Sequence, residues 1–168
     1  IIDPHRVRSR WGTSEDVERI LNDGLEMHEL CFQKRADLKG AYAIAHPQIT
    51  LTDPLRFFVT QFEDVIVNPQ IVRQTGHKLV KMEKCMSYPD SRWAKVPRSH
   101  KCVVSYQTIE ETEDGGYTIT GVRTRDLKGL EAEVWQHEID HLDATYIYDR
   151  EEREPDQGAG DDGKVPSA

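Results

Sequence analysis

The stretch "WQHEIDHLD", residues 135–143, places two histidines four positions apart, with a glutamate directly after the first. Successive helical residues are rotated by about 100°, so His137 and His141 lie about 40° apart on one helix face. Both imidazoles can therefore reach one metal ion, and Glu138 can take a proton from a water at the ion's open coordination position. The alternative interpretation is an exposed helix with two solvated histidines, because this short pattern also arises by chance.

A catalytic zinc or iron site needs a third protein ligand in addition to the two histidines. Cys85 lies in "MEKCMSYPD", residues 82–90, where a β-patterned run gives way to a proline turn. A thiolate at the end of a rigid strand is well held for metal ligation. Cys31 and Cys102 fit the core better, and four other histidines are isolated candidates: His28, His46, His77 and His100.

The composition predicts one soluble domain, expected to span residues 1–150, followed by an acidic, disordered tail at 151–168. The net charge is −8, and no basic stripe is visible in the sequence, which argues against DNA as a partner. No apolar run approaches the ~20 residues of a membrane helix. Three widely spaced cysteines favour a reducing compartment. We therefore expect the cytoplasm, an organellar matrix, or the host cytoplasm if a phage encodes the chain.

The apolar spacing predicts a surface helix over residues 14–36, with Ser14 as its N-cap, followed by a shaped loop over 40–54. A second helix is predicted from near Leu127. Between them lie β-branched runs, with reversals expected at Asn68-Pro69 and Thr75-Gly76. These runs are "FFVT" (57–60), "DVIVN" (64–68), "IVRQTG" (71–76), "HKLVKME" (77–83), "KCVVSY" (101–106) and one strand within "EDGGYTITGVRTR" (113–125). The predicted fold class is α+β, with antiparallel strands surrounding a central helix that carries the two histidines.

Three blocks of the chain resemble peptide deformylases, in the same order and at similar spacing. They are "AYAIAHPQ" (41–48), "EKCMS" (83–87) and "QHEIDH" (136–141), within a similarity that extends from about residue 2 to residue 150. The resemblance implies one divalent metal ion, usually Fe²⁺, with Zn²⁺, Ni²⁺ or Co²⁺ able to replace it. It also implies a formylated peptide substrate, which we expect to be a nascent chain at the ribosome.

The resemblance further implies the roles of individual residues. The metal ligands would be Cys85, His137 and His141. Glu138 would act as general base and then as the acid for the departing amine. The side-chain amide of Gln48 and the backbone N–H of Met86 would donate to the formyl oxygen as negative charge develops there.

The chain departs from the family pattern beside the expected substrate cleft. Glycines of the first block are replaced by Ala41 and Ala43, and an alanine by His46. Lys84 replaces another glycine, and Glu133 occupies a position that is usually arginine or aliphatic. The expected substrate-binding residues are Ala43, Ile44, His46, Arg92, Leu130, Glu133 and Val134.

Within this set, Arg92 would lie beside the substrate backbone. Leu130 and Val134, with Tyr42 or Ile44, would hold the methionine side chain. An ion pair between Glu83 and Arg98 is expected behind the site.

Two other functions stay open from the sequence. A zincin-like endopeptidase would take its third ligand downstream of His141, where only acids remain. A deformylase-like protein without turnover would bind modified N-terminal peptides, and the altered first block favours it. The intact Glu138 speaks against this second alternative, because binding alone does not need a general base.

Overall fold

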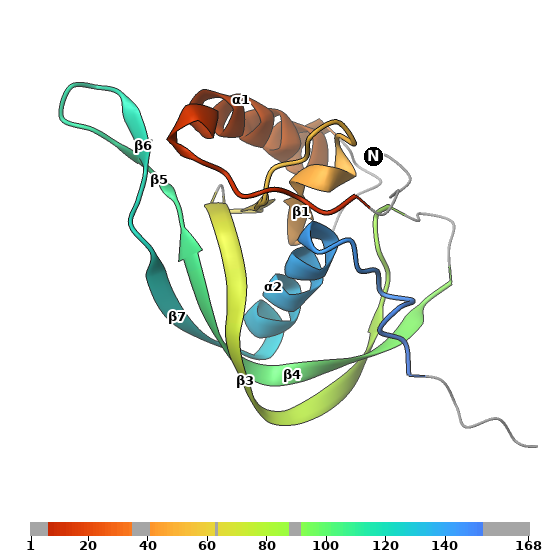
Figure 1. Ribbon diagram of the computed structural model, residues 1–168. Helices are drawn as coiled ribbons and strands as arrows, with labels where there is room; N and C mark the ends of the chain where they lie inside the picture. Colours follow the sequence, from red (N-terminus) through yellow and green to blue (C-terminus); the bar gives the residue numbers. More distant parts are fainter. Residues whose placement is uncertain (1–6, 35–40, 63, 88–91, 153–168) are drawn as a thin grey trace, which may run out of the picture.

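The computed structural model describes residues 7–34, 41–62, 64–87 and 92–152 (Figure 1). Its helical elements are η1 (Ser14–Asp16), α1 (Val17–His28), a π-helical turn η2 (Glu29–Lys34), η4 (His46–Gln48) and α2 (Gly129–Leu142). Its strands are β1 (Ala43–Ala45), β2 (Phe57–Thr60), β3 (Val65–Glu83), β4 (Ala94–Gln107), β5 (Ile109–Glu111), β6 (Tyr117–Ile119) and β7 (Arg123–Lys128).

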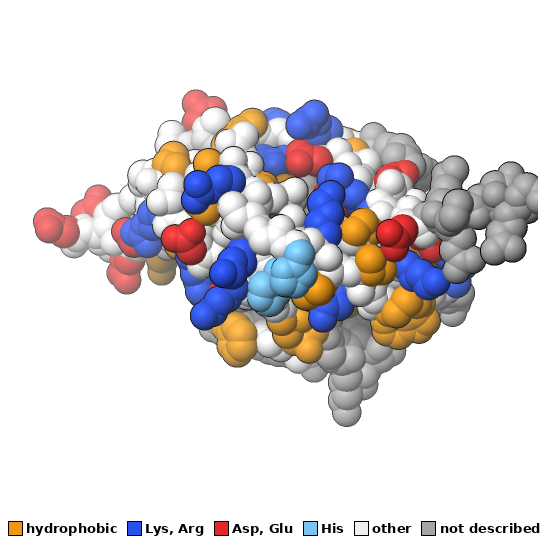
Figure 2. Space-filling model, turned by 90° about the horizontal axis from the view of Figure 1, so that it is seen from below, with side chains coloured by type: hydrophobic (Ala, Val, Ile, Leu, Met, Phe, Trp, Pro, Cys, Tyr) orange, Lys and Arg blue, Asp and Glu red, His pale blue; other side chains and the backbone are white. Residues whose placement is uncertain are grey.

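Five strands form one antiparallel sheet in the order β1-β2-β3-β4-β7, while β5 and β6 form a separate two-stranded hairpin. The predicted class is confirmed as a mixed fold of two helices and an antiparallel sheet. The long ribbon of β3 and β4 curves beneath α2, and α1 lies above (Figure 1). Seen from below, the molecule presents Lys and Arg side chains, a group of histidines and several hydrophobic side chains (Figure 2). No helix in the described ranges has the length and apolar character to cross a membrane.

The first helix is shorter than predicted and begins with a different cap. Thr13, not Ser14, is the N-cap residue, and its backbone N–H donates to a carboxylate oxygen of Asp16 at 2.8 Å. The α-helical part ends at His28 and continues as a π-helical turn to Lys34, and the predicted residues 35 and 36 lie outside the described ranges. The face with Ile20 and Met27 is fully buried against β2.

The two reversals predicted inside the β region are wrong, because β3 continues through both. Asn68 (φ 51°) and Gly76 (φ 79°) do adopt the left-handed conformation that suggested turns. Each lies at an irregularity in the pairing of β3 with β4, between Val67 and Gln70 and between Thr75 and Lys78. An extra residue at such a β-bulge bends and twists a strand without ending it. The turn-forming residues therefore curve β3 around α2.

Helix α2 is held in one orientation by two neighbouring side chains. The Trp135 ring packs edge-on against Phe58 at 5.2 Å and Tyr106 at 5.3 Å between centroids. The Gln136 amide accepts from the Ser99 N–H at 3.0 Å and donates to the Ser99 carbonyl at 2.8 Å. These bonds and ring contacts tie α2 to the sheet. They therefore also determine the direction in which His137 and Glu138, the next residues of α2, point.

Three further expectations need correction or lie outside the described ranges. Helix α2 begins at Gly129, because Leu127 still belongs to β7 and is buried in the core. The strand predicted within residues 113–125 is divided into β6 and β7. Of the predicted tail, residues 153–168 lie outside the described ranges.

Candidate metal centre and active site

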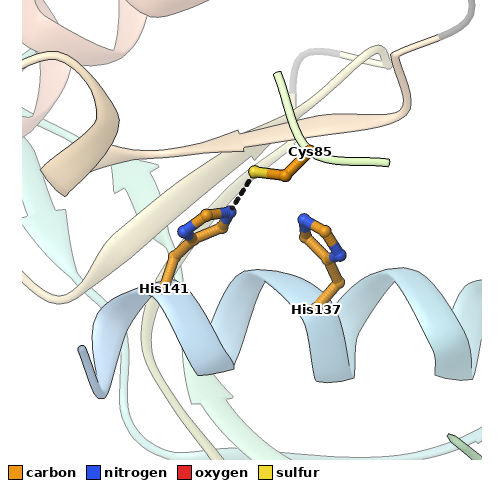
Figure 3. A group of neighbouring side chains, drawn as sticks. All are labelled: Cys85, His137 and His141. Atoms are coloured by element: carbon orange, nitrogen blue, oxygen red, sulfur yellow. Dashed lines mark hydrogen bonds between the residues drawn. The ribbon is translucent and has the colours of Figure 1, made fainter. Parts of the chain in front are cut away.

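Helix α2 and the chain just after β3 bring three ligand-type side chains together (Figure 3). Cys85 follows the end of β3 by two residues, while His137 and His141 project from successive turns of α2. The Cys85 Sγ lies 3.2 Å from His141 Nε2, and one ligand atom from each residue lies within 4.8 Å of the others. Ligands at 2.0–2.3 Å from a tetrahedral ion are separated by roughly 3.3–3.6 Å. The trio therefore fits one ion after small side-chain adjustments.

The electrostatics of the trio suit a cation. Burial by itself raises the pKa of the Cys85 thiol, but the adjacent imidazoles of His141 and His137 outweigh burial and hold the pKa well below its ordinary value. Burial lowers the pKa of His137, whereas Cys85 and Glu83 raise it to about 10. A divalent cation that binds the thiolate competes with the proton on His137, so its binding releases protons.

An ion-pair network behind α2 orients one of the ligands. His137 Nδ1 lies 2.9 Å from Glu83 Oε2, which leaves Nε2 for a metal. Arg98 donates to both oxygens of Glu83 at 2.8 and 2.9 Å and to Asp140 at 2.5 Å. Arg150 donates to the other oxygen of Asp140 at 2.8 Å. The expected Glu83–Arg98 ion pair is thus confirmed.

Glu138 is a buried carboxylate with one oxygen unused. It is 5% exposed, and its Oε2 has no hydrogen-bond partner among the described residues. Burial is the main cause that raises the pKa of Glu138. A buried polar atom without a partner is costly, and a water or polar substrate group in the adjacent cavity would satisfy it. This is an arrangement typical of a general base.

A cavity of about 340 Å³ opens beside the trio and is mostly apolar. Of the expected substrate-binding residues, Ala43, Leu130, Glu133 and Val134 line it. Its remaining walls are formed by Ala41, Tyr42, Gln48, Lys81, Met82, Glu83, Lys84, Met86, Trp93, His137 and Glu138. The space next to the ligand trio is therefore large enough for an amino-acid side chain and the adjoining peptide group.

Gln48 presents its amide to this cavity in a fixed orientation. Its Oε1 accepts from the Ala45 N–H at 2.8 Å, and its Nε2 donates to the Ser87 hydroxyl at 3.1 Å. An amide nitrogen carries two hydrogens, so one stays available for a cavity ligand. Met86, the residue directly after Cys85, also lines the cavity.

Three of the expected substrate-binding residues do not line the cavity. Ile44 is fully buried in the core beside α1. His46 is also fully buried, with Nε2 3.0 Å from Asp23 and Nδ1 accepting from the Leu55 N–H at 2.8 Å. Both expectations are corrected: neither side chain faces the cleft.

Arg92 is the third such residue, and its side chain is engaged elsewhere. It donates to both carboxylate oxygens of Glu151, with the Nη2 bond at 2.7 Å, and its guanidinium lies 5.1 Å from the centroid of the Tyr148 ring. A role beside a substrate would require this exposed pair to open.

Several residues of the site were not predicted from the sequence. Lys81, Met82 and Trp93 line the cavity, and Lys81 Nζ lies 3.7 Å from Glu133 Oε1 across its wall. Ser87 orients Gln48. The alternation of β3 contained a signal for Lys81, because Lys81 and Glu83 lie two apart and therefore on one face of the strand.

Comparison with known proteins is consistent with this geometry. The Polypeptide deformylase family model matches residues 13–156. The peptide deformylase of Dictyoglomus thermophilum is 33% identical over 141 residues, which cover 81% of this chain and 77% of that protein. The peptide deformylase of Thermotoga neapolitana is 30% identical over 110 residues, which cover 64% of this chain and 60% of that protein.

The fold agrees as well. The crystal structure of the Thermotoga maritima peptide deformylase superposes with a TM-score of 0.68 at 28% identity, covering 88% of this chain and 90% of that one. The Thermus thermophilus peptide deformylase gives 0.62 at 28% identity, covering 89% and 82%. With the ligand trio, the buried glutamate and the cavity in place, the chain belongs to the peptide deformylase family, metal-dependent hydrolases that remove the formyl group from the N-terminus of formylated peptides.

Proposed function

We propose that this chain hydrolyses N-formylmethionyl peptides with one divalent ion held by Cys85, His137 and His141, and that Fe²⁺ is the ion in the cell. The observation that carries the proposal is the unpartnered oxygen of Glu138 beside a compact Cys-His-His trio, in one cavity. The ion, when bound, supplies Lewis-acid polarisation of water and of the formyl oxygen. We further propose that the substrate is met at the ribosome, in the cytoplasm.

The residues around the trio would each perform one task. Glu138 takes a proton from the attacking water, and its raised pKa suits a base that must later return that proton to the departing amine. The free amide hydrogen of Gln48 and the backbone N–H of Met86 donate to the formyl oxygen as its negative charge grows. Glu83 holds His137 in the orientation that a metal requires.

The cavity walls would select the first residue of the substrate. Tyr42, Leu130 and Val134 provide apolar contact for a methionine side chain. Lys81 and Glu133 add a charged pair to the same wall, with Glu133 only 15% exposed. We propose that this pair, in a position that is usually apolar or arginine in the family, weakens the preference for methionine.

The other two functions are less well supported. A zincin-like site would need a third ligand after His141, whereas the cluster of the described residues uses Cys85. A protein without turnover would gain nothing from a buried glutamate with an unpartnered oxygen. Such an oxygen lowers the stability of the fold, and it is useful only where a proton must be transferred.

The decisive experiment measures formate release from formyl-Met-Ala-Ser with anaerobically purified protein and determines the bound metal on the same sample. We expect stoichiometric iron and turnover that a chelator abolishes. Glu138→Ala should lower kcat by about 10²–10⁴-fold while retaining the metal. Glu131→Ala, on an exposed part of the same helix, is the matched control and should leave kcat unchanged. Turnover that survives Glu138→Ala would refute the mechanism.

A further inference from the structure

Lys84 lies at the border of the substrate cavity, at a position where the sequence departs from the family motif. It follows the end of β3 by one residue and directly precedes Cys85, and it is exposed while it lines the cavity. A lysine carries its ammonium group on a flexible four-carbon stem. Lys84 therefore adds a positive charge where the cavity meets solvent.

The acids of the cavity wall do not neutralise this charge. Both oxygens of Glu83 accept from Arg98. Glu133 is paired with Lys81 at 3.7 Å. The third acid of the wall, the buried general base, is 5% exposed, whereas Lys84 is exposed. No acid among the described residues forms an ion pair with Lys84, so its ammonium is available to a ligand of the cavity.

Lys84 and Trp93 lie just beyond the end of the pairing between β3 and β4. The last paired residues are Glu83 and Ala94, so the next positions outward are Lys84 on one chain segment and Trp93 on the other. Both line the cavity, and Trp93 is 56% exposed. The border of the cavity thus combines a cation with an aromatic surface that can contact the apolar part of a peptide.

The length of the lysine side chain brings its charge to the second or third residue of a bound peptide. The ammonium of an extended lysine lies roughly 6 Å from its Cα, and neighbouring Cα atoms are about 3.8 Å apart. The charge of Lys84 can thus lie up to roughly 10 Å from the Cα of Cys85. A peptide whose formyl group lies at the Cys-His-His trio advances at most about 3.3–3.6 Å per residue, so its second and third residues fall within this range.

We propose that Lys84 is a specificity-determining residue, which favours formylated peptides that carry a carboxylate at their second or third residue. This inference rests on the proposed function and names the substrate class of the same site. Within this range, the anion of an unmodified peptide is the side chain of an aspartate or glutamate, or the C-terminus of a very short peptide. Exposed charges more than about 8 Å away are largely screened at physiological salt. The nearby ammonium, and not the net charge of −8, therefore determines the preference.

The test compares peptide amides that differ by one carboxylate. The pairs are formyl-Met-Ala-Glu-amide with formyl-Met-Ala-Gln-amide, and formyl-Met-Glu-Ala-amide with formyl-Met-Gln-Ala-amide. The amide removes the C-terminal charge, and glutamine matches the shape of glutamate. In at least one pair, we expect the parental chain to show a kcat/KM for the glutamate peptide about 2–5-fold above that for the glutamine peptide, the range of an exposed ion pair. The difference should lie in KM, because the contact is made equally in the ground state and in the transition state.

Variants of Lys84 separate its charge from its shape. Lys84→Gln should abolish the preference for the glutamate peptide, Lys84→Glu should reverse it, and Lys84→Arg should retain it. In 1 M salt, where the Debye length is about 3 Å, the parental preference should disappear as well. The matched control is Lys101→Gln, which removes another exposed lysine that does not line the cavity, and it should retain the parental preference.

Equilibrium binding keeps this inference apart from the proposed function. The same peptides are titrated by calorimetry into Glu138→Ala, which should leave them intact, and into Glu138→Ala/Lys84→Gln. Tighter binding of a glutamate peptide to Glu138→Ala, lost in the double variant, supports the inference even if the parental chain has no turnover, a result that would refute the proposed function alone. Equal affinities within both pairs, a preference that survives Lys84→Gln, or no peptide binding at all overturns the inference, whether or not the parental chain releases formate.

Discussion

The ion-pair network behind α2 makes a quantitative prediction for Arg98→Leu. Arg98 is 3% exposed and makes three charge-assisted hydrogen bonds to Glu83 and Asp140, both of which are largely buried. Leucine removes all three donors, and two carboxylates then remain with one partner each, His137 and Arg150. Breaking a buried ion pair by removing one partner costs about 3–5 kcal/mol in the free energy of unfolding. With an m value of about 2 kcal/mol/M, the urea midpoint should fall by roughly 1.5–2.5 M.

The matched control separates burial from the mere presence of an ion pair. Arg125 also joins the sheet to α2 through a carboxylate, Glu131, at 2.7 Å, but both side chains are nearly half exposed. Arg125→Leu should cost at most about 1 kcal/mol, because water screens this pair. Both variants are measured by urea denaturation followed by circular dichroism. If both variants lose the same free energy of unfolding, the argument that burial, rather than bond length, determines the energy of an ion pair is refuted.

Arg98→Leu should also weaken metal binding. Burial alone would raise the pKa of Glu83, but Arg98 and His137 lower it to about 2, so Glu83 is an anion that can accept from His137. Loss of such a supporting carboxylate contact typically costs 10–100-fold in metal affinity. Competition with a chelator measures this affinity. We expect Arg98→Leu to lower the metal affinity by that factor, while Arg125→Leu retains the parental affinity.

Three further predictions concern residues of the cavity wall and of the buried core. Gln48→Ala should lower kcat for formyl-Met-Ala-Ser by about 10²–10³-fold, the usual effect of removing an oxyanion donor, and an unchanged kcat would exclude that role. The double variant Lys81→Met/Glu133→Ile should raise kcat/KM for the same substrate by roughly 10-fold, because the methionine side chain then meets an apolar wall, whereas a decrease would show that the charged pair assists binding. Burial lowers the pKa of His46 from 6.5, so the unfolded state binds its proton more readily. The free energy of unfolding should therefore fall as the pH drops below 6.5, and His46 contributes at most about 1.4 kcal/mol per pH unit to this fall. The urea midpoint of His46→Gln should lack that part of the pH dependence.

The metal trio was accessible from the sequence because two of its members are neighbours on one helix. The i, i+4 spacing of His137 and His141 determines their common face wherever the helix packs. Cys85 was found only as a strand-end cysteine in a motif similar to that of a known family, since no local rule states which residue lies opposite a helix. The mixed fold with an antiparallel sheet followed in the same way from short β-branched runs between two helical patterns.

The errors arose where a local signal has more than one structural solution. Asn68 and Gly76 adopt the left-handed backbone that their residue types favour. Whether such a residue reverses the chain or forms a bulge depends on whether a partner strand continues beside it, and β4 does continue. His46 lies in the motif that borders the cleft, yet its ring enters the core because Asp23 and the Leu55 N–H offer partners for both nitrogens there.

Residue types and their short-range spacing were thus sufficient for the helix that carries the histidines, for the strand-rich middle of the chain and for the nature of its chemistry. Packing settled which side chains meet: Arg98 with Glu83 and Asp140, and Lys81 with Glu133. The physical reason is that the face of a strand residue depends on register. Register is determined by bulges and by strands distant in sequence, so the face on which a strand residue lies cannot be predicted from its neighbours in the chain alone.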